Sequence, residues 1–238
     1  MTIELPETIV GWNEPAGLTA RGTVIVVAGR GESAGVYERF GRRISADAWR
    51  VRVVVSVEQD VAAARGRIRA LLADDTLPAP RVLVGSDVGA ALVLQLAAEQ
   101  PDSLDAVVVA GLPTTASHRA LGSEAELRSA CPVHRRTLDD ESLIVRGALE
   151  TPIPGELIQL DVSNVRVPVL AVHGEADPVV ALHEAVEYYR GLPDREVLTV
   201  RGGLHDILND LSHRSVAATV VLFLERVKAG VPLVTVVE

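Results

Sequence analysis

The sequence predicts a single α/β domain spanning residues 1–238, with helices on both faces of a mostly parallel sheet. Short runs rich in Val and Ile alternate with helical stretches, which is the pattern of βαβ units. A length of 238 residues suits one such domain. Hydrophobic residues make up 48% of the chain and aromatic residues only 3%, so we expect an aliphatic core built around buried strands.

The expected strands are short, aliphatic and bounded by Gly, Pro or Asp. They cover residues 23–28, 51–57, 82–85, 106–110, 169–172 and 196–200, and residues 9–12 are a candidate antiparallel edge strand. The helices expected between them cover residues 37–47, 60–73, 88–99, 182–190 and 215–228. Because strands and helices alternate, the connections are expected to be parallel crossovers.

One region, residues 112–167, interrupts this alternation because it contains no clear aliphatic strand. It has proline boundaries at Pro132, Pro152 and Pro154, and its charge-rich stretches 123–129 and 138–149 are expected to be helical. An insertion of roughly 50 residues is usually functional or disordered, so we interpret it as a small helical lid over the sheet. A pair of ordinary peripheral helices is the alternative.

The composition limits the classes of partner. A net charge of −9 argues against nucleic-acid binding. The N-terminal residues 1–6 contain Glu4 and no basic flank, and no apolar run approaches the roughly 18 residues of a membrane span. With Cys131 as the single cysteine, a reducing, cytoplasmic location is expected. No cluster has metal-ligand spacing, and we expect no metal and no cofactor. The strand-like end, residues 231–238, could add to a sheet edge or to a second subunit, so a homo-oligomer stays open.

The most informative stretch is RVLVGSDVGAALVLQL, residues 81–96. A strand is expected to end at Gly85 and a helix to begin near Val88, and the sharp turn between them is typical of a nucleophile elbow. The central residue of such a turn is strained, so the residues two positions before and after it must be very small. Gly85 and Gly89 meet this requirement, which makes Asp87 the centre of the turn.

Two other interpretations of this turn stay open from the residues alone. Ser86 could be the central residue, but Val84 and Val88 would then flank it at two positions' distance, and both are β-branched. Asp87 could also serve only as a helix N-cap, since aspartate is favoured at that position.

Three further segments accompany the elbow: VIVVAGRGESAGVYERFGRRISADAWRV (24–51), VPVLAVHGEADPVV (167–180) and GGLHDILND (202–210). With GSDVG at the elbow, the chain resembles the α/β-hydrolase superfamily over nearly its whole length, and its loops resemble the monoacylglycerol lipase and lysophospholipase group. The resemblance implies a triad of Asp87, Asp177 and His205 in the superfamily's chain order. It also implies an oxyanion hole formed by the backbone N–H groups of Arg30 and Val88.

Each carried-over residue also has a plainer interpretation. Asp177 precedes Pro178 and could be a turn residue, whereas the loop position of His205 beside two glycines favours function. His173 resembles a structural histidine. The family's histidine before Gly29 is replaced by Ala28, and the side chain of Arg30 could face solvent or pair with Asp87.

An aspartate at the elbow favours attack on a saturated carbon. Its carboxylate is ionised at neutral pH, because the unperturbed pKa is about 3.9. Attack on an ester is unfavourable, since the intermediate would expel the carboxylate, the better leaving group by on the order of 12 pKa units. We therefore expect epoxide-type hydrolysis of a small apolar substrate through an alkyl-enzyme ester, which water activated by His205 and oriented by Asp177 would hydrolyse.

An aspartate nucleophile with this triad resembles that of epoxide hydrolases and haloalkane dehalogenases, but the residues that usually assist it in those families are missing. Dehalogenases of this fold place a tryptophan after the nucleophile, where this chain has Val88. Epoxide hydrolases donate protons from lid tyrosines, but the predicted lid contains no tyrosine, so His118 or His134 would have to act as the acid. An ester or thioester hydrolase resembling lysophospholipases, and a ligand-binding member without turnover, are therefore the two alternative functions.

Overall fold

The computed structural model describes residues 9–114, 122–158 and 160–234. Within them, seven strands form one sheet in the order β1-β3-β2-β4-β5-β6-β7, in which β1 is antiparallel and all other neighbours are parallel. The strands are β1 (Ile9–Trp12), β2 (Gly22–Val27), β3 (Trp49–Val54), β4 (Arg81–Ser86), β5 (Ala106–Ala110), β6 (Val169–Gly174) and β7 (Arg195–Val200). The predicted α/β class and the antiparallel edge strand are both confirmed.

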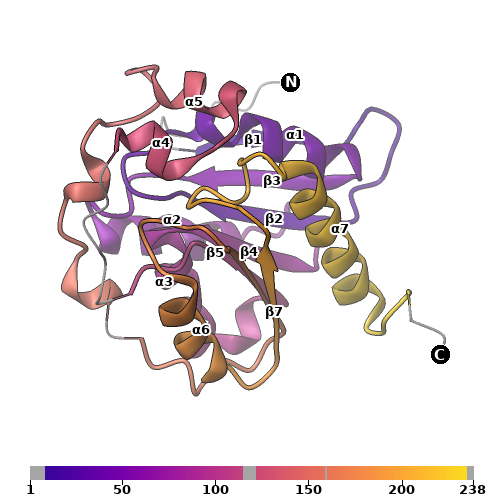
Figure 1. The fold of residues 1–238 in the computed structure, drawn as a ribbon. Coiled ribbons are helices and arrows are strands. Elements are labelled where there is room, and N and C mark those ends of the chain that lie inside the picture. The colour runs from indigo at the N-terminus through magenta and orange to yellow at the C-terminus, as the bar shows by residue number, and fades with distance from the viewer. Residues whose placement is uncertain (1–8, 115–121, 159, 235–238) are drawn as a thin grey trace.

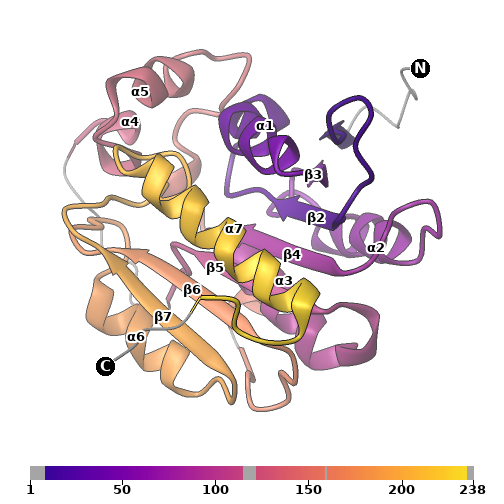
Figure 2. The ribbon, with the colours of Figure 1, turned by 90° about the vertical axis from the view of Figure 1, so that its right-hand side faces the viewer.

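Helices cover both faces of this sheet (Figures 1 and 2). One face carries α2 (Val61–Leu72), α3 (Val88–Glu99) and α6 (Leu182–Arg190), and the other carries α1 (Glu38–Ala46) and α7 (His213–Ala229). Alternate side chains of the central strands enter the two layers: Val27 packs with α3 and Val26 with α1. Since both faces are buried, these strands require continuous aliphatic runs, which is why the sequence revealed them.

Between β5 and β6 lie two short helices, α4 (Glu124–Arg128) and α5 (Pro132–Leu138), followed by two short 3₁₀ turns, Ala148–Glu150 and Gly155–Leu157. Figure 1 shows α4 and α5 beside one another at one end of the sheet. We call the described part of residues 112–167 the cap. That it acts as a lid stays a prediction.

One prediction within the cap is wrong, because residues 138–149 do not form an α-helix. The Asp140 side chain accepts hydrogen bonds from the backbone N–H and the hydroxyl of Ser142, which favours a turn. Beyond it the chain is extended, and the Val145 N–H donates to the carbonyl of Gly31. The helix α5 lies earlier, and Pro132 in its first turn is typical of a helix start.

No helix in the described ranges is long and apolar enough to span a membrane. Residues 231–234 of the strand-like end form no strand, and residues 235–238 lie outside the described part.

Candidate active site

The turn between β4 and α3 has the geometry of the predicted elbow. Asp87 has φ 49° and ψ −123°, a strained conformation for a residue other than glycine. A Cβ atom on Gly85 would overlap the carbonyl oxygen of Gly89, and one on Gly89 would overlap that of Val27. The Asp87 carboxylate does not cap α3. The elbow therefore centres on Asp87, and the interpretation of Asp87 as a helix cap is wrong.

The close packing at Gly89 gives a first prediction. Gly89→Ala forces a methyl group against the Val27 carbonyl on β2, and we expect it to lower the free energy of unfolding by about 3 kcal/mol or more. Urea unfolding measures this. Gly66→Ala in α2 is the control, because no atom lies within 4 Å of the added Cβ, and it should be neutral or stabilising by up to about 1 kcal/mol. Equal effects at the two sites would contradict the packing.

Arg30 holds the Asp87 carboxylate through three hydrogen bonds. Its backbone N–H and its Nε both donate to Oδ2, at 2.9 and 2.8 Å, and its Nη2 donates to Oδ1 at 2.9 Å. Arg30 Nη1 donates to the cap, at 3.0 Å to the Leu149 carbonyl and 3.4 Å to that of Thr151. Arg30 and Asp87 are only 2% and 1% exposed, so this is a buried, bidentate ion pair. The sequence left open whether the Arg30 side chain faces solvent or pairs with Asp87, and in the structure it pairs with Asp87.

His205 lies on the other side of Asp87. Its Nε2 is 3.5 Å from Asp87 Oδ1, an ion-pair distance without hydrogen-bond geometry, and its Nδ1 is 2.9 Å from Asp177 Oδ2. The other oxygen of Asp177 accepts from the backbone N–H groups of Val179 and Val180. The structure thus brings together the three predicted triad residues, from the loops after β4, β6 and β7.

Arg30, Asp87, His205 and Asp177 form a chain of alternating charge. Burial alone would raise the pKa of Asp87. The positive charges of Arg30 and His205 nevertheless hold this pKa well below its usual value. Burial opposes a charge on His205, but the carboxylates of Asp177 and Asp87 raise its pKa to about 10. We therefore expect two anions and two cations in the site near neutral pH, with His205 as an imidazolium.

The raised pKa of His205 predicts how stability depends on pH. The pKa of His205 is about 10 in the folded protein and 6.5 in the unfolded chain, so protonation of His205 stabilises the fold. This contribution is fully present below pH 6.5 and is lost as the pH rises through 10. We expect the free energy of unfolding to fall by roughly 1 kcal/mol per pH unit between about pH 8 and pH 9.5. Denaturant unfolding at several pH values measures it. His205→Gln should flatten this slope, and an unchanged slope would contradict the assignment.

A second buried ionic cluster lies behind the Arg30 loop. Arg128, on cap helix α4, donates to the Arg30 carbonyl at 2.7 Å, and its Nη1 lies 3.2 Å from Glu32 and 3.3 Å from Asp206. It also pairs with Glu124 at 2.9 Å. Arg128 is 0% exposed, so one buried guanidinium joins the cap to the loops that hold Arg30 and His205.

The pKa values of Glu32 and Asp206 shift in opposite directions within this cluster. Burial and the negative charge of Asp206 raise the pKa of Glu32 to about 8, against the opposing charge of Arg128. Burial alone would also raise the pKa of Asp206, but the positive charge of Arg128 holds this pKa below its usual value. Glu32 accepts hydrogen bonds from the Tyr37 hydroxyl and from the Gly29 N–H. Through these two hydrogen bonds Glu32 helps to fix the loop before Arg30.

Of the two proposed proton donors, the described one, His134, is not at the Asp87 carboxylate. His134 is buried, with its Nε2 3.0 Å from Asp206. His118 lies outside the described residues. His173 is structural, as expected, with its Nε2 2.9 Å from the Val180 carbonyl. In the described ranges, no three His, Cys, Asp or Glu side chains are grouped so as to hold a metal ion.

At the level of sequence, no family model and no curated protein matches the chain. Solved structures do match it. A monoacylglycerol lipase from Paleococcus ferrophilus has a TM-score of 0.73 at 15% identity, covering 93% of this chain and 98% of that one. The esterase RhEst1 from a Rhodococcus species has a TM-score of 0.70 at 20% identity, covering 92% and 95%. A soluble variant of the Saccharomyces cerevisiae monoglyceride lipase, in complex with a substrate analogue, has a TM-score of 0.68 at 13% identity. The match covers 92% of this chain and 91% of that one. The chain therefore has the α/β-hydrolase fold.

Proposed function

We propose that this chain is a ligand-binding member of the α/β-hydrolase fold in which Asp87 is the buried counter-ion of Arg30 rather than a nucleophile. The observation that carries the proposal is the triple hydrogen bond from Arg30 to the Asp87 carboxylate. Both carboxylate oxygens accept hydrogen bonds, and one of them occupies the backbone N–H of Arg30, the expected oxyanion donor.

Alkylation of Asp87 would be costly in this arrangement. An ester at Asp87 carries no negative charge, so Arg30 would become a buried cation without its partner. Removing the charge of one partner from a buried ion pair lowers the stability of the fold by about 3–5 kcal/mol. The surroundings of Asp87 therefore favour the free carboxylate over a covalent intermediate.

His205 is also in the wrong charge state for a base. Because Asp177 and Asp87 raise its pKa to about 10, His205 is expected to hold its proton at neutral pH, which disfavours its accepting one from water. The lipases and esterases of similar fold are named for ester substrates. Ester hydrolysis here would need water activated at His205, which this charge state disfavours as long as Asp87 is ionised.

Hydrolysis through an alkyl-enzyme ester is the second candidate, and one observation favours it. His205 Nε2 is buried without a hydrogen-bond partner in the described part of the chain, and it points at Asp87 from a position that Asp177 fixes. Esterification of Asp87 would remove one of the two carboxylates that raise the pKa of His205, so the imidazole could then act as a base. This route requires Arg30 to leave Asp87 before each turnover.

Single-turnover reactions in oxygen-18 water separate these functions. The protein is incubated with epoxide, haloalkane and ester panels, digested, and the peptide containing Asp87 is weighed. We expect no turnover and no label. Label in the Asp87 carboxylate would establish the alkyl-enzyme route, and His205→Gln should then accumulate the ester. Ester turnover without label, abolished by His205→Gln, would favour the lipase-like function.

A rebuilt site provides the positive control. Asp87→Ser together with Arg30→Met gives a Ser–His–Asp arrangement and removes the guanidinium from the oxyanion position. Measurable hydrolysis of an activated ester by this double variant, but not by Asp87→Ser alone, would show that Arg30 is what obstructs the wild-type site.

A further inference from the structure

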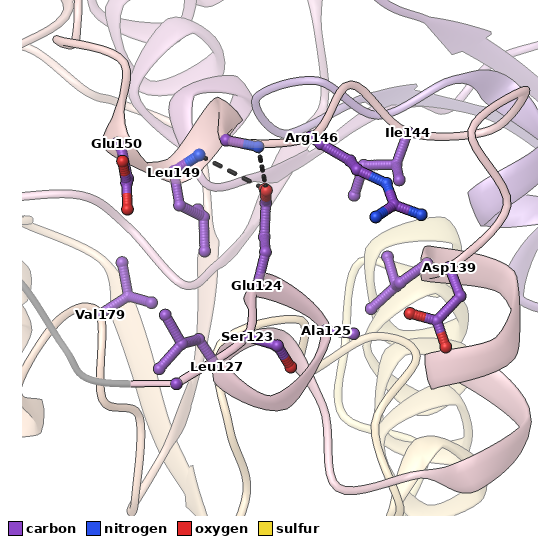
Figure 3. A pocket seen from close by; sticks show the side chains of 13 residues that line it. Ser123, Glu124, Ala125, Leu127, Asp139, Ile144, Arg146, Leu149, Glu150 and Val179 are labelled. Atoms are coloured by element: carbon purple, nitrogen blue, oxygen red, sulfur yellow. Dashed lines mark hydrogen bonds between the residues drawn. The ribbon is translucent and has the colours of Figure 1, made fainter.

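A cavity of about 640 Å³ lies within the cap and is closed on one side by Val179 (Figure 3). Helix α4, the end of α5 and residues 144–150 form its walls, and Val179 comes from the loop that also carries Asp177. The volume is within the range of small-molecule sites, about 300–1,000 Å³. Asp87 and His205 do not line it, so the cavity is a separate space beside the ionic site.

The lining of the cavity is mixed, with aliphatic side chains gathered on one side and polar and charged residues around the rest. Figure 3 shows Leu127, Leu149 and Val179 together on one side. Two carboxylates, Asp139 and Glu150, also line it, and neither has a cationic partner among the described residues.

The two other charged residues of the lining are already paired. Glu124 binds Arg128, and Arg146 Nε lies 3.0 Å from Glu141. Among the described residues, three carboxylates and one guanidinium therefore line the cavity, and the two carboxylates without a cationic partner, Asp139 and Glu150, leave it negative on balance. Such a cavity suits an apolar body with a cationic head, and it disfavours an anionic one.

The wall of this cavity is hydrogen-bonded to the ionic site. Glu124 accepts from the backbone N–H of Gly147 at 2.6 Å and of Leu149 at 3.4 Å, shown as dashed lines in Figure 3. The carbonyl of the same Leu149 accepts from Arg30 Nη1 at 3.0 Å. One residue thus lines the cavity and anchors the guanidinium that holds Asp87.

We propose that this cavity is the ligand site of the protein and that it takes an aliphatic molecule with a cationic, amine-type head. The inference rests on the proposed ligand-binding function but needs no chemistry at Asp87. The aliphatic body lies against Leu127, Leu149 and Val179, and the amine lies near Glu150, which Figure 3 shows on the same side of the cavity. An occupied cavity packs against Leu149 and keeps Arg30 on Asp87.

Calorimetric titration with three matched probes tests the site: n-octylamine, 1-octanol and octanoate, near neutral pH. We expect saturable binding in the order amine, alcohol, carboxylate. The double variant Glu150→Gln, Asp139→Asn should weaken amine binding about tenfold and leave the alcohol unchanged. Glu187→Gln, which changes an exposed carboxylate paired with Arg190 outside the cavity, is the matched control. Thermal unfolding checks that each variant folds.

Octanoate binding as tightly as the amine, no loss of amine affinity in the double variant, or no saturable amine binding would overturn the proposal. The outcomes are separable from those of the oxygen-18 experiment. Turnover together with selective amine binding would refute only the proposed function, whereas no turnover and no amine binding would refute only the cavity assignment.

Discussion

Replacing Arg128 by methionine is expected to lower the free energy of unfolding by about 3–5 kcal/mol. The guanidinium is fully buried between Glu32, Asp206 and Glu124, and it donates to the Arg30 carbonyl. Methionine keeps much of the volume but leaves Asp206 and Glu124 without their main cation. The variant should also release the cap from the Arg30 loop, because Arg128 contacts both.

Urea unfolding measures the loss of stability, and hydrogen exchange across the cap measures its release. Arg136→Met is the matched control, since Arg136 is an exposed cation on the neighbouring helix α5, and it should change stability by less than about 0.5 kcal/mol. Comparable losses for the two variants would mean that the Arg128 cluster does not hold the cap in place.

Asp87→Asn is expected to cost a similar amount, about 3–5 kcal/mol, because it leaves Arg30 as a buried cation without a charged partner. A nucleophile that is not needed for the fold would behave in the opposite way. Its removal commonly leaves stability unchanged or improves it, since strained active sites are maintained at the expense of stability.

A double-mutant cycle separates the ion pair from other effects of the substitution. Arg30→Met should destabilise alone, and the combination with Asp87→Asn should recover at least about 2 kcal/mol relative to the sum of the single changes. The exposed pair Glu187 and Arg190 provides the reference cycle, with a coupling below about 1 kcal/mol. A coupling between Arg30 and Asp87 no larger than this reference would contradict the buried pair.

Most of the fold was predictable because the central strands β2, β4, β5 and β6 are buried on both faces. Their aliphatic runs, the small glycines at the elbow and the chain order of the loops are all local patterns. Helices α3 and α6 and strands β1 and β5 have the predicted limits. The positions of Asp87, Asp177 and His205 follow from the fold, since the carboxyl ends of parallel strands meet at one edge of the sheet.

The state of the site could not be predicted from the sequence, since it depends on contacts between distant residues. Arg30 reaches Asp87 57 positions away, and Arg128 reaches Glu32 96 positions away. The sequence suggested that Arg30 was unusual but left open where its side chain points. No local pattern around Arg128 indicated a buried cation, because its charge-rich surroundings are typical of an exposed helix.

The protonation state of His205 in the free protein tests the chain of alternating charges most directly. Nitrogen-15 chemical shifts of the His205 ring near pH 8 distinguish an imidazolium, with both nitrogens protonated, from a neutral imidazole with one. The proposed function predicts the imidazolium, converting to the neutral form only near pH 10. A neutral ring at pH 8 with Nε2 unprotonated and facing Asp87 would contradict it and would mark His205 as a base ready for catalysis.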